Sequence, residues 1–323
     1  MKKSASFFLV VFSMILVTSC GSNPYSKTNR MHKRQAKFLS KQLRTFPPEQ
    51  GGEVAILNFA EDWVGTTNFN LRKPNYVIIH HTAQDSVEQT LRTFTLPRTS
   101  VSSHYVISDD GEIYQMLNDY YRGWHAGVGK WGNNTDLNSS SIGIELDNNG
   151  FEPFSEAQIK SLIDLLGVLK ERHGIPTANF IGHSDIAPSR KVDPNVNFPW
   201  ERLAEEGYGY WYDETAVTPD ILEDSIPDVM EDSIPAISDN TRNRSLLLTE
   251  AEVLDNSTSL DSITLTINPE LALRVIGYDT SDLEAAIKAF KLHFIQEDVN
   301  AILTDEDLKI LYNLARKYME GQN

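Results

Sequence analysis

The sequence predicts an α/β fold, with a mixed central β-sheet flanked by helices, followed by a small C-terminal three-helix module. Two observations point to it. Between about residues 75 and 205, short β-branched runs alternate with helix-forming segments, which favours one layered α/β domain. After residue 268, three more segments have helical periodicity. A chain of 323 residues is long enough for more than one domain.

The first half of the α/β region predicts a strand, a helix and a hairpin. The run "YVIIHH" at 76–81 is β-branched and follows a proline. A helical pattern begins near Ser86. "HYVIS" and "EIYQML" lie on either side of the turn "DDG", a pattern typical of a β-hairpin.

The second half predicts two more strands and two helices. "SIGIEL" at 141–146 is a strand, with Gly143 inside it. The longest helix starts with Ser155 and Gln158 in capping-box spacing and stops at Gly174. "NFIGH" predicts the last strand, and "PWERLAEEG" a final helix with Pro199 in its first turn. In the C-terminal module, the second helix begins with Ser281 and Glu284, and the third near Thr304.

The N-terminus has the pattern of a secretory signal. Lys2 and Lys3 precede an apolar stretch that is too short for an ordinary membrane span. The sole cysteine, Cys20, follows small residues as in a bacterial lipobox, which predicts a lipidated first residue. The alternative is a plain signal peptide with an incidental cysteine. The mature chain can form no internal disulfide.

Charge divides the rest of the chain. From Gly21 to Pro48 there are seven Lys/Arg and no acids, which suits a solvated tether near an anionic lipid surface. Between Trp211 and Glu270 there are fourteen acids and two arginines, and "EDSIP" occurs twice, which indicates a disordered linker. Candidate short strands in this region are Ser245–Thr249 and Ser262–Thr266. We therefore predict a signal (1–20), a basic tether (21–45), the main domain (46–213), the linker (214–267) and the helical module (268–323).

The histidines raise the question of a metal. Six of eight fall between His80 and His183, several at the ends of predicted strands. A single strand histidine more often packs in a core. Two at the ends of different strands, with an aspartate nearby, favour a zinc site, because a catalytic zinc takes three protein ligands and keeps one position open. The neighbouring carboxylates are Asp185 and Asp193.

Five motifs carry a resemblance to a known family. "VIIHHTA", "SSHYVIS", "WHAGVGKWG", "SIGIEL" and "GHSDIAPSRKVDP" occur in the order found in zinc-dependent N-acetylmuramoyl-L-alanine amidases. These type 2 amidases share a fold with peptidoglycan recognition proteins. The resemblance spans roughly Asn75 to Trp211. "IGYDTSDLEAAIKAFKLHF" resembles a peptidoglycan-binding module, although "AFK" replaces the usual "AFQ" and Asn300-Ala301 the usual Asp-Gly. Those departures leave simple domain packing as the alternative to glycan binding.

The resemblance implies one Zn²⁺ ion held by His80, His183 and Asp193. His81 alternates to the opposite face of the strand, so it is expected to pack or to support the site. Asp185 competes with Asp193 for the third position. Asp185 could instead cap the turn or accept hydrogen bonds from backbone amides.

The resemblance also assigns catalytic roles. It makes Glu145 the general base and later acid, whereas the sequence alone allows an ordinary strand carboxylate. It makes Lys191 the group that meets the developing oxyanion, the alternative being a solvated basic patch. Arg190 is expected to be structural and to pair with a carboxylate such as Asp185.

The glycine-rich loop at 122–131 completes the expected site. By resemblance, Trp124 and His125 line the substrate groove, although Trp124 could equally pack in the fold. His104 is a candidate supporting residue that orients a ligand or water.

Together these features imply a zinc hydrolase that cleaves the amide between N-acetylmuramic acid and L-alanine in peptidoglycan or its fragments. The alternatives are a non-catalytic lipoprotein that tethers the outer membrane to the wall, and a zinc endopeptidase acting on the stem peptide. The expected location is the outer membrane, anchored through Cys20 and facing the periplasm. We expect a monomer with peptidoglycan or muropeptide as partner and no nucleic acid.

Overall fold

The computed structural model of the chain describes residues 23–44, 71–214 and 268–321. Contacts divide the chain at residue 70: one unit contains helix α1 (Ser26–Arg44), and the other contains the sheet and the remaining helices. The expected signal, Cys20, nearly all of the linker and both candidate strands within it lie outside the described residues. Within the described ranges, no helix is both long and apolar enough to span a membrane.

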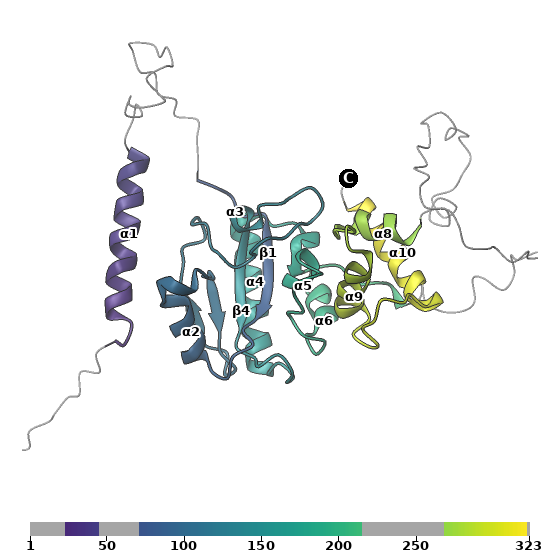
Figure 1. Ribbon diagram of the computed structural model, residues 1–323, viewed down its shortest axis with the longest axis horizontal. Coiled ribbons are helices and arrows are strands. Elements are labelled where there is room, and N and C mark those ends of the chain that lie inside the picture. Colours follow the sequence, from purple (N-terminus) through teal and green to yellow (C-terminus); the bar gives the residue numbers. More distant parts are fainter. Residues whose placement is uncertain (1–22, 45–70, 215–267, 322–323) are drawn as a thin grey trace, which may run out of the picture. The chain divides into compact units, whose positions relative to one another are not determined.

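A five-stranded mixed sheet organises the second unit (Figure 1). Its strands are β1 (Tyr76–His81), β2 (Tyr105–Ile107), β3 (Ile113–Gln115), β4 (Ser141–Leu146) and β5 (Phe180–Gly182). Their order is β3-β2-β4-β1-β5. The β2–β3 hairpin is antiparallel and the other pairs are parallel. The predicted mixed sheet is thereby confirmed.

Eight further α-helices are described in this unit. They are α2 (Val87–Thr95), α3 (Leu137–Ser140), α4 (Glu156–His173), α5 (His183–Ile186), α6 (Trp200–Glu205), α8 (Pro269–Ile276), α9 (Leu283–Phe294) and α10 (Asp305–Glu320). Helix α4 begins at its expected cap, since Ser155 Oγ accepts a hydrogen bond from Gln158 N at 3.1 Å. The Gln158 side chain does not complete the capping box. It is buried and donates instead to the carbonyls of Ile107 and Asp147.

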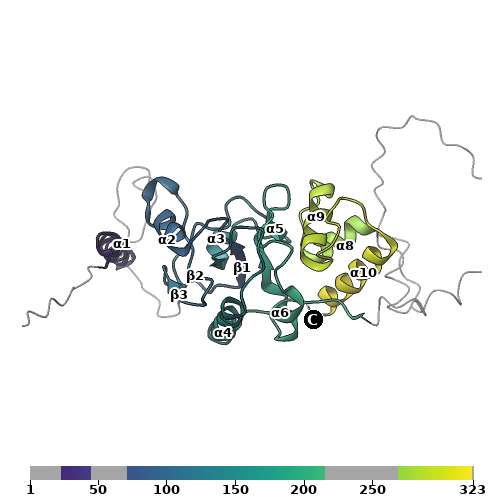
Figure 2. The same ribbon diagram turned by 90° about the horizontal axis from the view of Figure 1, so that it is seen from below.

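Strand alternation separates the two faces of the sheet. Val77 and Ile79 of β1 share a core with Ile144 of β4 and with α4, which covers this face (Figure 2). The side chains that alternate with these residues along β1 and β4 therefore point to the opposite face. His80 and Glu145 are both on that second face, and they are paired in the β1–β4 register.

The three C-terminal helices pack on the second face. Ile78 and Ile181 of the sheet and Ile186 of α5 share one core with apolar residues of α8, α9 and α10. Helices α5 and α9 lie side by side (Figures 1 and 2). The helical module is thus continuous with the sheet domain, and its packing reaches the element that begins with His183.

Lys291 is the residue that departs from the usual "AFQ" pattern, and the structure places it in the core of the module. Its ammonium is buried, lies 3.1 Å from the Asp307 carboxylate and donates to the Ile302 carbonyl. A buried lysine is tolerated when it is paired and hydrogen-bonded in this way. The substitution therefore has a structural account. Another departure is the cap of α9, which is Asp282 rather than Ser281.

Candidate metal centre

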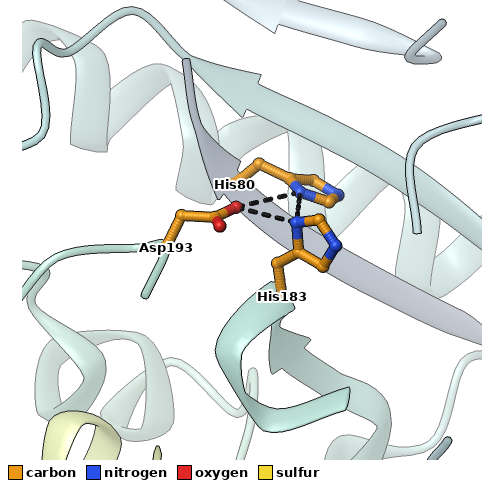
Figure 3. A group of neighbouring side chains, drawn as sticks. All are labelled: His80, His183 and Asp193. Atoms are coloured by element: carbon orange, nitrogen blue, oxygen red, sulfur yellow. Dashed lines mark hydrogen bonds and ion pairs between the residues drawn. The ribbon is translucent and has the colours of Figure 1, made fainter. Parts of the chain in front are cut away.

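Three side chains converge near the carboxyl ends of strands β1 and β5 (Figure 3). His80 ends β1, His183 begins α5 directly after β5, and Asp193 lies in the following loop. Because β1 and β5 are adjacent and parallel, their carboxyl ends place His80 and His183 together. The Nδ1 atoms of the two histidines are 2.9 Å apart, and Asp193 Oδ2 lies 3.2 Å and 3.0 Å from them. All three residues are buried.

The arrangement fits a tetrahedral metal ion. Ligands about 2.1 Å from zinc lie about 3.4 Å from one another in a tetrahedron, close to the separations of these three atoms. Burial, reinforced by the charge of His183, lowers the pKa of His80 to about 4. Burial opposes ionisation of Asp193, but its close contacts with His183 and His80 outweigh it and lower its pKa below the usual range. A neutral imidazole and an ionised carboxylate are the forms that bind a metal.

A chain of hydrogen bonds fixes the tautomer of His80. Its Nε2 lies 3.1 Å from His125 Nδ1, and His125 Nε2 lies 3.3 Å from Ser141 Oγ. For Nδ1 of His80 to face the cluster as an acceptor, its Nε2 must carry the proton and donate it to His125. His125 then donates onward to Ser141. Such outer partners orient a metal ligand and raise its basicity.

His183 is held in a similar way by Ala126, which follows His125 in the loop at 122–131. Its Nε2 donates to the Ala126 carbonyl at 3.1 Å, which leaves Nδ1 free to accept. Arg190 also donates to the Ala126 carbonyl, and to that of Val128. The expected pairing of Arg190 with Asp185 is therefore wrong, because the Arg190 guanidinium is bound to the loop.

The loop at 122–131 differs in part from its expected role. His125 is only 7% exposed, so its ring supports the cluster of candidate metal ligands instead of lining an open groove. The ring needs the space left by Gly143, where an added Cβ would lie 2.4 Å from His125 Cγ. Trp124 is 53% exposed and remains accessible from solvent. The loop thus combines a buried support with an exposed aromatic face.

Glu145 and Lys191 lie beside the cluster. Burial raises the pKa of Glu145 well above its usual value, the charge of Asp193 adds to this, and Lys191 opposes it. Lys191 also acts on the pKa of His80, in the lowering direction. The Lys191 side chain, which is partly buried, is therefore near enough for its charge to reach both groups.

The remaining predicted residues lie around the cluster and not in it. His81 points to the other face, where its Nδ1 accepts a hydrogen bond from Asn195 N at 3.1 Å. Asp185 is fully buried, and its carboxylate accepts from Gly182 N, from Tyr278 and from the ring N–H of His293. His104 accepts from Gly143 N and packs edge-on to His125.

Sequence reasoning missed four supporting residues: Ser141, Asn138, Tyr278 and His293. Asn138 Oδ1 accepts the backbone N–H groups of both His125 and Ala126 at 3.0 Å. Tyr278 and His293 come from the C-terminal module, 93 and 108 residues away from Asp185. No local pattern could identify them, because their role depends on a partner that only the fold brings near.

Comparison with known proteins adds a family match. Residues 70–196 match the family described as N-acetylmuramoyl-L-alanine amidase. The chain is 40% identical over 157 residues to N-acetylmuramoyl-L-alanine amidase AmiD of Escherichia coli, covering 44% of this chain and 56% of AmiD. It is 41% identical over 103 residues to 1,6-anhydro-N-acetylmuramyl-L-alanine amidase AmpD of Haemophilus influenzae, covering 32% and 56% of the two chains. This chain thus spans just over half the length of these curated relatives.

Two solved structures resemble the fold over a longer stretch. One is E. coli AmiD in complex with the substrate anhydro-N-acetylmuramic acid-L-Ala-D-gamma-Glu-L-Lys, at a TM-score of 0.58 and 27% identity, covering 80% of this chain and 94% of that one. The other is Pseudomonas aeruginosa AmpDh3 in complex with anhydromuramic pentapeptide, at a TM-score of 0.58 and 25% identity, covering 81% and 99%.

Proposed function

From the type 2 N-acetylmuramoyl-L-alanine amidase domain that this chain carries, we propose that the protein hydrolyses the amide between N-acetylmuramic acid and L-alanine. The observation that carries the proposal is the buried cluster of His80, His183 and Asp193 at the sheet edge. The substrate class is peptidoglycan or its fragments, since AmiD and AmpDh3 were solved with anhydromuramyl peptides.

In this proposal His80, His183 and Asp193 hold one zinc ion. Zinc in such a site polarises the scissile carbonyl and lowers the pKa of water towards about 7. Glu145 takes up a proton as general base and later returns it as general acid. Burial raises its pKa above the usual value, which favours its protonated form. Lys191 supplies a positive charge for the oxyanion. His125 and Ala126 keep the ligand atoms of the two histidines aimed at the metal.

Trp124 is proposed to contact the sugar or the stem peptide. Its exposed indole lies in the same loop as His125 and Ala126, which touch the ligand histidines. An aromatic face beside a reactive centre suits packing against a substrate that lies in an open groove.

The decisive experiment is digestion of purified peptidoglycan and of soluble anhydromuropeptides by residues 21–323, with and without a chelator. Mass spectrometry should find free stem peptides beginning with L-alanine, and the chelator should abolish them. Intact muropeptides would support a tethering lipoprotein instead. Cleavage between stem residues would support an endopeptidase.

Lipid anchoring of Cys20 at the outer membrane, facing the periplasm, is part of the same proposal. It is supported by the sequence of the N-terminus. Mass spectrometry of the mature N-terminus should find acylated Cys20, and a Cys20→Ser variant should lack the acyl mass and leave the membrane fraction. An unmodified N-terminus at any other residue would contradict the anchor.

A further inference from the structure

Helix α1 has an unusual distribution of charge. Its 19 residues contain seven lysines and arginines and no aspartate or glutamate. At about 100° per residue, all seven fall within an arc of about 120°. They are Lys27, Arg30, Lys33, Arg34, Lys37, Lys41 and Arg44. The segment expected to be a solvated tether therefore contains a helix with one continuous basic face.

The rest of the circumference of α1 contains no lysine, arginine, aspartate or glutamate and is partly apolar. Met31, Phe38, Leu39 and Leu43 lie there, with exposed fractions of 50%, 56%, 37% and 75%. Gln35 and Gln42 lie among them on the same side. No residue of α1 is buried. Large apolar side chains left exposed beside a basic face are typical of an interfacial helix.

A second copy of α1 is a poor occupant for this face. A coiled-coil seam through Met31 and Phe38 would also run through Gln35 and Gln42, which places polar residues at alternate seam positions. Nucleic acid would use the basic face but leave Phe38 and Leu43 unused. An anionic lipid surface can contact both the apolar and the basic residues. The helix is only about 10–12 Å across, and the Debye length is about 8–10 Å, so the basic residues stay within electrostatic reach of the headgroups when the apolar side chains enter the bilayer.

We propose that α1 binds in the interface of an anionic phospholipid bilayer, with its apolar side chains at the acyl boundary and its lysines and arginines among the headgroups. This binding does not depend on the amidase activity. Beside the lipid expected on Cys20, it supplies a second membrane contact.

The test uses residues 21–323, which carry no lipid. The protein should sediment with vesicles containing about 30% anionic phosphatidylglycerol and not with pure phosphatidylcholine, and binding should weaken at least tenfold as salt rises. The double variant Lys33→Glu, Lys37→Glu should lower the partition coefficient at least tenfold. Phe38→Ser with Leu43→Ser should also lower it, with less salt dependence.

The matched control reverses two exposed charges outside α1, with Arg98→Glu and Lys288→Glu. It should bind vesicles like the parent, and all variants should cleave soluble muropeptides at the parent rate. Equal binding to neutral vesicles, or an equal loss in the control, would overturn the proposal. The proposal would also be overturned if sedimentation equilibrium showed that the parent is a dimer and the α1 variants are monomers, or if the protein bound nucleic acid more tightly than vesicles.

Discussion

The Asp185 carboxylate lies 2.8 Å from His293 Nδ1, which joins the helix that carries His183 to the C-terminal module. Tyr278 donates to the same carboxylate, and Trp200 stacks on His293 with ring centroids 3.8 Å apart. Asp185 is fully buried. The C-terminal module therefore supports, through Asp185, the short helix that begins with the candidate ligand His183.

Removal of His293 should destabilise the whole unit. His293→Ala removes one of the three hydrogen bonds to the buried Asp185 carboxylate, which costs about 1–3 kcal/mol. Denaturant unfolding should report a loss of this size, with unfolding of α9 and of the sheet domain remaining coincident. The exposed Lys288→Ala on the same helix should change stability by less than about 0.5 kcal/mol. A similarly small loss for His293→Ala would show that the contact is not stabilising.

Asp193 and Asp185 should differ in their effect on metal content. Asp193→Ala removes an oxygen that lies within 3.2 Å of both imidazole nitrogens, so bound zinc should fall far below one equivalent. Asp185→Ala should lower stability but keep most of the zinc in the folded fraction. Metal analysis of purified, folded protein measures both. Equal losses would count against Asp193 as the third ligand.

His125 should control metal affinity through His80. His125→Ala removes the acceptor for His80 Nε2, and loss of such a partner costs about 10–100-fold in affinity. His125→Asn restores an acceptor near the Nδ1 position and should recover part of the loss. Competition with a chromophoric chelator gives the dissociation constants. A purely structural role for His125 would lower stability in both variants and leave metal affinity unchanged.

Glu145 should be needed for turnover and not for metal binding. Glu145→Gln keeps the shape of the side chain but cannot take up a proton, so kcat should fall about 10²–10⁴-fold. Zinc content and KM for an anhydromuropeptide should stay near those of the parent. Loss of zinc in this variant would instead point to a role in holding the metal.

Acid should weaken the fold partly through His104. Burial lowers its pKa from 6.5 to about 4, so the unfolded chain binds a proton more readily than the folded one. The stability contributed by neutral His104 is therefore complete above about pH 6.5 and is lost as pH falls to about 4, a loss of roughly 3 kcal/mol. His104→Asn should flatten the slope of unfolding free energy against pH in this window. An unchanged slope would rule out this group as its source.

Local sequence was a good guide where local physics decides the outcome. β-branched runs became β1 and β4, and Ser155 and Gly174 ended α4 where caps were expected. It failed where a side chain had two possible partners. The Gln158 side chain donates to buried carbonyls instead of completing the capping box, and Arg190 binds loop carbonyls instead of Asp185. Buried polar groups are almost always hydrogen-bonded, so the arrangement that satisfies most of them is favoured.

The sequence by itself determined the alternating elements, the spacing that leaves His80 and His183 at strand ends, and the run of basic residues without acids before Pro48. Strand period and helix period follow from residue order alone. Only the tertiary structure decided that His125 and Ala126 hold the two histidines, and that Asp185 accepts hydrogen bonds from the C-terminal module. A buried donor pairs with an acceptor that the packed sheet and helices bring within hydrogen-bond distance. These partners are far apart in the sequence, so no local pattern identifies them.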